Sequence, residues 1–233
     1  MTEASYLHRR AELKTYFDRT ALDAWAKLTS NAKVSGIRAT VRAGREEMRR
    51  TLLGWLPSDL SGARVLDAGC GTGMLAVEVA RRGADVVASD LSPALIEIAS
   101  QRKPDDLGGG HISFHVGDML DSGLGRFDYV VAMDSLIHYR SADIAAAVAG
   151  FAERTSEAVL FTYAPRTPAL SAMHAAGRLF PKSDRAPAIE PVGDRAIRRA
   201  LATAAGLGGW APAREHRVTR GFYMSKALEM RPS

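Results

Sequence analysis

Short apolar segments alternate with amphipathic segments from residue 63 onward, and this alternation predicts parallel strands joined by crossover helices. Gly83 is expected to end one of these helices as a C-cap, and Ser92 followed by Pro93 is expected to begin the next. We predict strands at residues 63–68, 85–89, 111–116, 127–133 and 158–163, and helices at 74–82, from 93 onward, and at 141–154.

The N-terminal part of the chain lacks such strands. Residues 9–30 and 41–56 repeat apolar residues at helical spacing, with a polar turn between them. We therefore expect a helical cap over residues 1–57, followed by the main domain over residues 58–233.

The C-terminal part changes pattern again. Residues 169–180 and 194–205 have helical spacing, and an insertion over about residues 166–192 is expected on the substrate side. Residues 210–216 and 218–226 are predicted as two strands joined directly, which must pair antiparallel. The expected fold is thus α/β: a mostly parallel seven-stranded sheet with an antiparallel C-terminal hairpin, N-terminal helices and a helix inserted after the fifth strand. This plan is typical of Rossmann-like class I methyltransferases.

Composition narrows the class of protein. No apolar run approaches the roughly 20 residues that a membrane span needs, and the N-terminus lacks the apolar core of a secretory signal. Cys70 is the only cysteine, which excludes an intrachain disulfide and a cysteine-rich zinc site. The net charge of +5 comes from scattered basic residues rather than a block. We expect a cytoplasmic protein with no metal of its own and no nucleic-acid partner.

A glycine-rich loop follows the first predicted strand and opens the first helix. Gly69, Gly71 and Gly73 allow a sharp turn and a close ligand, and Asp67 precedes them. A nicotinamide dehydrogenase would place its third glycine at position 74, which is Met74. The loop therefore favours S-adenosylmethionine, whose ammonium group a carboxylate can meet.

Acidic residues also end the next three predicted strands. Asp90 is suited to accept both ribose hydroxyls of the donor, and Asp118 the adenine amino group, with Met119 packed on the ring. Asp134 is expected to hold the donor's amino group, although each of these acids alone also suits a cap or loop. The predicted donor-binding residues are Asp67, Gly69, Cys70, Gly71, Gly73, Asp90, Leu91, Asp118, Met119 and Asp134.

With these residues placed, the chain resembles the magnesium-protoporphyrin IX methyltransferases of chlorophyll and bacteriochlorophyll synthesis nearly end to end. The most specific segment, Met133 to Tyr139, is similar to the family's Leu-Asp-Val-Leu-Ile-His-Tyr. Arg45 departs from the family's Arg-x-Gly-His pattern, and Thr29 lies near a position where chlorophyll-branch relatives carry tyrosine. The other matching segments are Tyr16-Phe17 with Trp25, Arg42-x-Gly44, residues 67–73, Ser89-Asp90, residues 163–167, residues 179–181 and residues 222–226.

The resemblance implies methyl transfer from S-adenosylmethionine to one propionate of Mg-protoporphyrin IX, giving the monomethyl ester and S-adenosylhomocysteine. It also implies a transient contact with magnesium chelatase and at most a peripheral association with the photosynthetic membrane. His138 is expected to orient the reacting carboxylate as the catalytic residue; the alternative is a histidine bonded to a backbone carbonyl. The expected substrate-binding residues are Tyr16, Phe17, Trp25, Tyr139, Arg166, Met173 and Phe180, for which ordinary core or surface positions are the alternative.

Two other kinds of methyltransferase and a non-catalytic module are the alternatives to this function. The nearest alternative is a class I O- or N-methyltransferase of another small molecule. A nucleic-acid methyltransferase would need a basic groove and usually an Asp-Pro-Pro-aromatic motif, whereas Asp134 begins Asp-Ser-Leu-Ile. A regulatory module that binds the donor without turnover is the alternative from another class.

Overall fold

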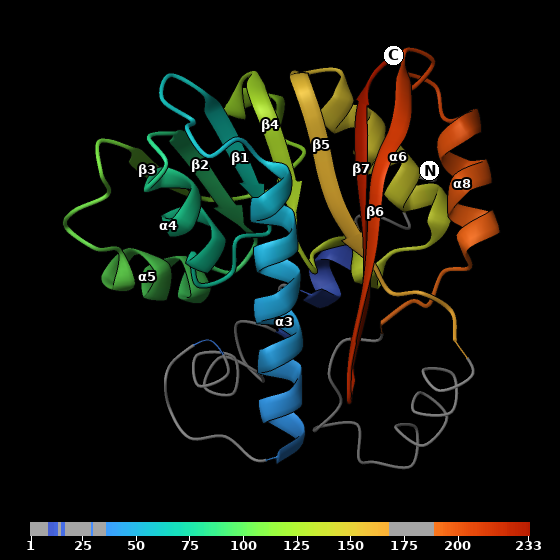
Figure 1. Ribbon diagram of the computed structural model, residues 1–233, viewed down its shortest axis with the longest axis horizontal. Helices are drawn as coiled ribbons and strands as arrows, with labels where there is room; N and C mark the ends of the chain where they lie inside the picture. The colour runs from blue at the N-terminus through green and yellow to red at the C-terminus, as the bar shows by residue number, and fades with distance from the viewer. Residues whose placement is uncertain (1–8, 14, 17–28, 30–35, 168–188) are drawn as a thin grey trace.

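The computed structural model describes residues 9–13, 15–16, 29, 36–167 and 189–233 (Figure 1). In chain order the elements are α3 (Gly36–Trp55), β1 (Arg64–Ala68), α4 (Met74–Ala80), β2 (Asp85–Asp90), α5 (Pro93–Arg102), β3 (His111–Val116), the 3-10 helix η1 (Ser122–Leu124), β4 (Phe127–Ala132), the 3-10 helix η2 (Leu136–His138), α6 (Ser141–Ala152), β5 (Thr155–Tyr163), α8 (Asp194–Thr203), β6 (Trp210–Arg220) and β7 (Tyr223–Pro232).

The strands form one seven-stranded sheet in the order β3-β2-β1-β4-β5-β7-β6. The first five strands are parallel, whereas β7 pairs antiparallel with both β5 and β6. This confirms the predicted fold. The strand order reverses between β1 and β4, and in open α/β sheets ligands bind beyond the carboxyl ends of the strands at such a reversal.

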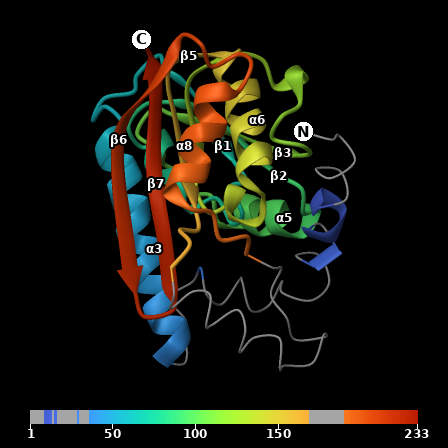
Figure 2. The same cartoon turned by 90° about the vertical axis from the view of Figure 1, so that its right-hand side faces the viewer.

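Helices cover both faces of the sheet. Figure 2 shows α3 on one side of the strands and α6 with α8 on the other. Met48 and Leu52 of α3 are fully buried and pack with α4 and one face of β1, β2 and β4. The opposite core contains Ile144 and Val148 of α6 together with Ile197 of α8. The second half of α3 therefore belongs to the core of the main domain, although the sequence placed it in a separate cap.

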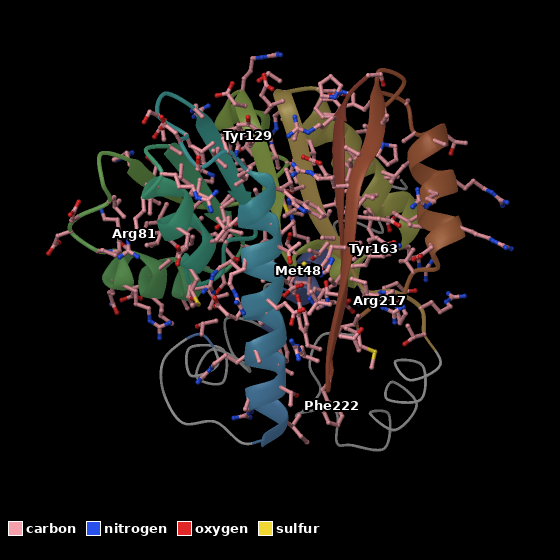
Figure 3. All side chains as sticks on the ribbon, in the orientation of Figure 1. Met48, Arg81, Tyr129, Tyr163, Arg217 and Phe222 are labelled. Carbon is pink, nitrogen blue, oxygen red and sulfur yellow. The ribbon has the colours of Figure 1, made fainter. Side chains whose placement is uncertain are left out.

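The predicted bounds hold best where an apolar strand is flanked by turn residues. Residues 111–116 were placed correctly, whereas α3 begins at Gly36 rather than at 41, and β5 begins at Thr155 rather than at 158. The C-terminal turn was placed wrongly: the hairpin turns at Gly221 and Phe222, and Phe222 is labelled near its tip in Figure 3. Most of β6 is exposed and polar, so it lacks the alternation that would locate the strand.

Two further predictions involve residues outside those described. They are most of the first helix predicted over 9–30 and the helix predicted over 169–180. Residues 9–13 and 15–16 are helical. Within the described ranges, no helix combines the length and the apolar character needed to cross a membrane.

Candidate functional site

A cavity of about 790 Å³ lies at the carboxyl ends of β1, β2 and β4, where the strand order reverses. Its wall also includes Leu13 and Tyr16 near the N-terminus, one side of α3, and the start of β7. Nine of the ten predicted donor-binding residues line it: Asp67, Gly69, Cys70, Gly71, Asp90, Leu91, Asp118, Met119 and Asp134.

The loop between β1 and α4 has a backbone that favours glycine. Gly69 and Gly71 have φ angles of 81° and 55°, in the left-handed region. A Cβ on Gly69 would overlap the side chain of Ser135, so the close approach of these segments also requires glycine. The N–H groups of Gly69 and Cys70 donate to the Ser89 carbonyl at 2.8 and 3.0 Å, which ties the loop to the end of β2.

The carboxylate of Asp90 faces this loop, as the sequence predicted. Its Oδ2 accepts a hydrogen bond from the Gly71 N–H, and its Oδ1 accepts one from the Ser92 N–H, both at 2.9 Å. These two backbone bonds fix the orientation of the carboxylate. The pairing with ribose hydroxyls stays a prediction.

Asp118 and Met119 follow β3 and line the next part of the wall. The Leu120 N–H donates to Asp118 Oδ1 at 2.9 Å, and Arg10 forms an ion pair with Asp118 Oδ2 at 2.6 Å. The N-terminal helical segment thus contacts the acid predicted to bind adenine.

A buried arginine binds the backbone of the loop that follows β3. Arg154, after α6, is 9 % exposed and donates to the backbone carbonyls of Met119 and Asp121. Its guanidinium also lies over the aromatic ring of Phe127, 5.6 Å from the ring centre. Because these bonds run to the backbone, Arg154 fixes the position of the loop whatever the ligand.

Asp67 is the most strongly perturbed acid of the cavity wall. It is 2 % exposed, and burial raises its pKa to about 7, with a smaller contribution from the charge of Asp90 and an opposing one from the Ala76 N–H. Among the described residues, its Oδ2 has no hydrogen-bond partner. A buried carboxylate oxygen without a partner suits a cationic ligand such as an ammonium group.

Asp134, in contrast, is surrounded by donors from three elements. Its carboxylate forms an ion pair with Arg45 at 2.6 Å and accepts hydrogen bonds from Tyr223 at 2.9 Å, and from Ser225 and Thr162 at 3.3 Å. It has a φ angle of 56°, the only positive one among the described non-glycine residues. This network holds the left-handed backbone in place. It joins α3, β5 and β7 at the cavity, and the ammonium binding that the sequence suggested for Asp134 stays a prediction.

His138 lies in η2, directly after β4, and lines the cavity as predicted. It is 8 % exposed, and its neighbour Tyr139 is buried as well. Burial, followed by the charge of Asp118, raises the pKa of Tyr139, and burial also raises the pKa of Tyr16. Both tyrosines line the cavity and are neutral donors at physiological pH.

Several predicted residues are not part of this wall. A Cβ on Gly73 would come within 3.2 Å of Ala99 and Phe114, so this glycine serves packing at the start of α4. Arg166 is exposed beside Val192 in a separate depression of about 260 Å³, because the chain turns away from the cavity after β5. The remaining predicted residues, Phe17, Trp25, Met173 and Phe180, lie outside the described residues.

The sequence prediction missed the polar side of α3. Arg42, Arg45 and Arg49 line the cavity, and their spacing of three and four residues marks a single helix face. That spacing was a usable signal. The local sequence gave no sign that Tyr223 would line the cavity, because its position depends on β7 lying against α3.

Comparison with known proteins adds two matching family models. One, the magnesium-protoporphyrin IX methyltransferase C-terminus, matches residues 132–232, and the other, a methyltransferase domain, matches residues 65–157. Among curated relatives, the magnesium-protoporphyrin O-methyltransferase of Rhodobacter capsulatus is 52% identical over 98% of this chain and 99% of that protein. The chloroplastic magnesium protoporphyrin IX methyltransferase of Arabidopsis thaliana is 31% identical over 94% of this chain and 70% of that protein.

Solved structures agree with these relatives. The crystal structure of magnesium protoporphyrin IX methyltransferase from Synechocystis PCC 6803 with bound S-adenosylhomocysteine has a TM-score of 0.83 and 29% identity. It covers 96% of this chain and 100% of that chain. The same enzyme with bound S-adenosylmethionine gives a TM-score of 0.79 at 26% identity, covering 97% of each chain.

Proposed function

The chain belongs to the magnesium-protoporphyrin IX methyltransferase family, and on that premise we propose that it methylates a propionate carboxylate of Mg-protoporphyrin IX with S-adenosylmethionine, giving the monomethyl ester. The observation that carries the proposal is the full-length relationship to the Rhodobacter capsulatus enzyme. The cavity supports it, because the residues expected to bind the donor meet there.

The described residues fit the donor. The unpartnered Oδ2 of Asp67 suits the ammonium group, Asp90 the ribose hydroxyls, and Asp118 with Met119 the adenine ring. When bound, S-adenosylmethionine supplies an electrophilic methyl group whose transfer leaves the bonding electron pair on sulfur. The glycine backbone of the loop leaves room for a ligand close to Gly71.

No strong base is needed on the substrate side, because a carboxyl group with a pKa of roughly 4 is already ionised at neutral pH. The protein therefore contributes position and exclusion of water. We propose that His138 donates a hydrogen bond that orients the propionate. Its burial beside Tyr139 limits the number of water molecules that compete for the carboxylate.

The porphyrin needs apolar cover and a cation for its second propionate. Tyr16 and Tyr139 line the cavity, and we propose that the N-terminal cap and the insertion at about 166–192 complete the cover on the substrate side. Because Arg166 lies away from the cavity, we propose that the cavity-lining arginines of α3 supply the positive charge, although Arg45 and Arg49 also pair with acidic residues of the protein.

We further propose that the porphyrin arrives by transient contact with magnesium chelatase and that the protein touches the membrane peripherally. Ile37 and Phe222 support the second point, because these large apolar side chains are 56 % and 48 % exposed. They belong to the start of α3 and the tip of the β6–β7 hairpin, which lie at the same end of the molecule (Figure 1).

The test is to incubate the protein with Mg-protoporphyrin IX and S-adenosylmethionine carrying a deuterated methyl group, and to measure the mass of the porphyrin. We expect one labelled methyl group that alkaline hydrolysis removes, as an ester requires. Mg-protoporphyrin dimethyl ester, with both propionates blocked, serves as the control and should gain no label. Unchanged porphyrin mass, or a label that survives hydrolysis, would overturn the proposal.

A further inference from the structure

We propose that the hydroxyl group of Ser135 binds the α-carboxylate of the methyl donor, beside an ammonium site formed by Asp67. Ser135 lines the cavity between β4 and η2 and was not among the residues predicted from the sequence. The inference takes S-adenosylmethionine binding at this cavity as its premise.

Two buried polar atoms of the cavity wall have no hydrogen-bond partner in the described protein. Among the described residues, only Asp67 Oδ2 and Ser135 Oγ are buried side-chain oxygens or nitrogens without a hydrogen-bond partner. Leaving such a group unpaired destabilises the folded state, so native structures rarely contain one without a reason. Both atoms belong to residues of the same cavity wall, so a ligand in the cavity is the candidate for the partner that the described protein atoms do not supply.

Ser135 lies directly against the glycine-rich loop. It packs against Gly69 so closely that a Cβ on that glycine would overlap its side chain. Asp67 lies two residues before Gly69 and pairs in the sheet with Val131 of β4, the strand that leads to Ser135. The two unpartnered groups therefore flank the same glycine.

Asp134, the other acidic residue near Ser135, already has partners within the protein. The carboxylate of Asp134 already forms an ion pair with Arg45 and accepts hydrogen bonds from Tyr223. Asp67 is thus the better acceptor for the ammonium group. In an α-amino acid the carboxylate is attached to the same carbon as the ammonium group, so a neighbouring hydroxyl donor is matched to it.

Calorimetric titration with ligands that lack defined groups tests the inference. Ser135→Ala should weaken S-adenosylhomocysteine about tenfold, the effect of losing one hydrogen bond to a charged group. Its affinity for 5′-(3-aminopropylthio)-5′-deoxyadenosine, which lacks the carboxylate, and for 5′-methylthioadenosine, which lacks the whole amino-acid end, should stay within twofold of wild type. Asp67→Asn should weaken both amine-containing ligands but not 5′-methylthioadenosine.

Ser156→Ala is the matched control, because Ser156 is exposed, lies outside the cavity wall and donates a hydrogen bond to Asp128 at 3.0 Å. It should leave all three affinities unchanged. Equal losses for all three ligands in Ser135→Ala, or no loss for S-adenosylhomocysteine, would overturn the inference. If the wild type binds none of the ligands, the premise of a donor site in this cavity fails instead.

Discussion

At Asp67, burial and ligand chemistry act on the same carboxyl group. Removal from water raises the pKa of Asp67 to about 7, so a large fraction of its carboxyl groups is protonated in the unliganded protein at neutral pH. The ionised form is the one that an ammonium group requires. Binding of the donor and release of this proton are therefore coupled.

This coupling predicts a pH dependence of binding. Below about pH 7 the protonated fraction of Asp67 rises, so the affinity for S-adenosylhomocysteine should fall about twentyfold between pH 7.5 and 5.5. Asp67→Asn should bind weakly and show little of this dependence in the same calorimetric titrations. An affinity of the wild type that is flat over this range would contradict the assignment.

The same raised pKa affects the unliganded protein in the opposite direction. The stability that Asp67 contributes is fully present below its unfolded pKa of roughly 4 and is lost as the pH rises through about 7. Donor binding should therefore stabilise the protein more at pH 7.5 than at pH 5.5, which thermal melts with and without S-adenosylhomocysteine would measure.

His138 carries a further prediction at the residue scale. Because it is expected to orient the propionate and not to hold the donor, His138→Ala should keep the wild-type affinity for S-adenosylhomocysteine. Its single-turnover rate with Mg-protoporphyrin IX should fall about a hundredfold, the order of magnitude that positioning contributes. A variant with an unchanged rate would exclude His138 from the reacting site.

Local motifs and their positions in the fold explain which site residues the sequence could predict. Asp90 and Asp118 were found because each follows a strand with a clear apolar pattern, and the loop from Gly69 to Gly71 has its own signature. Ser135 could not be found in this way, because its significance depends on contact with a loop more than sixty residues earlier.

At the scale of elements, α3 and β7 meet closely beside the donor site. A Cβ on Gly44 would lie 2.7 Å from the Cβ of Tyr223, whose hydroxyl donates to Asp134. The close contact at Gly44 therefore links the position of α3 to the hydrogen-bond network around Asp134.

We expect Gly44→Ala to lower the free energy of unfolding by about 1–3 kcal/mol, because the core there has no room for a methyl group. Gly54→Ala in the same helix is the matched control: it is exposed, meets no neighbouring atom, and should stabilise by up to about 1 kcal/mol. Urea denaturation measures both values. A stabilising Gly44→Ala would show that α3 does not pack as described.

The parallel strands and the C-terminal hairpin differ in how far sequence determines them. The parallel edge strand β3 was placed at residues 111–116, where Ile112, Phe114 and Val116 alternate with polar residues between two glycine-containing turns. In β6, exposed polar residues and an irregularity between Pro212 and Glu215 remove the alternating pattern. The register of the hairpin is determined by its pairing with β7, which local sequence does not reveal.

At the scale of the whole molecule, segments far apart in the chain build one cavity. Leu13 and Tyr16 near the N-terminus, the glycine loop, His138 and Tyr223 near the C-terminus all line it. The match to the Rhodobacter capsulatus enzyme likewise extends over 98% of the chain, at 52% identity. Donor and porphyrin are expected to share this single cavity.

The most direct test of this account is a crystal structure of the protein with S-adenosylhomocysteine. The account predicts that the ribose lies against Asp90, the adenine beside Asp118 and Met119, and the amino-acid end toward Asp67. Density for the ligand at another site, or a ribose that makes no contact with Asp90, would contradict it.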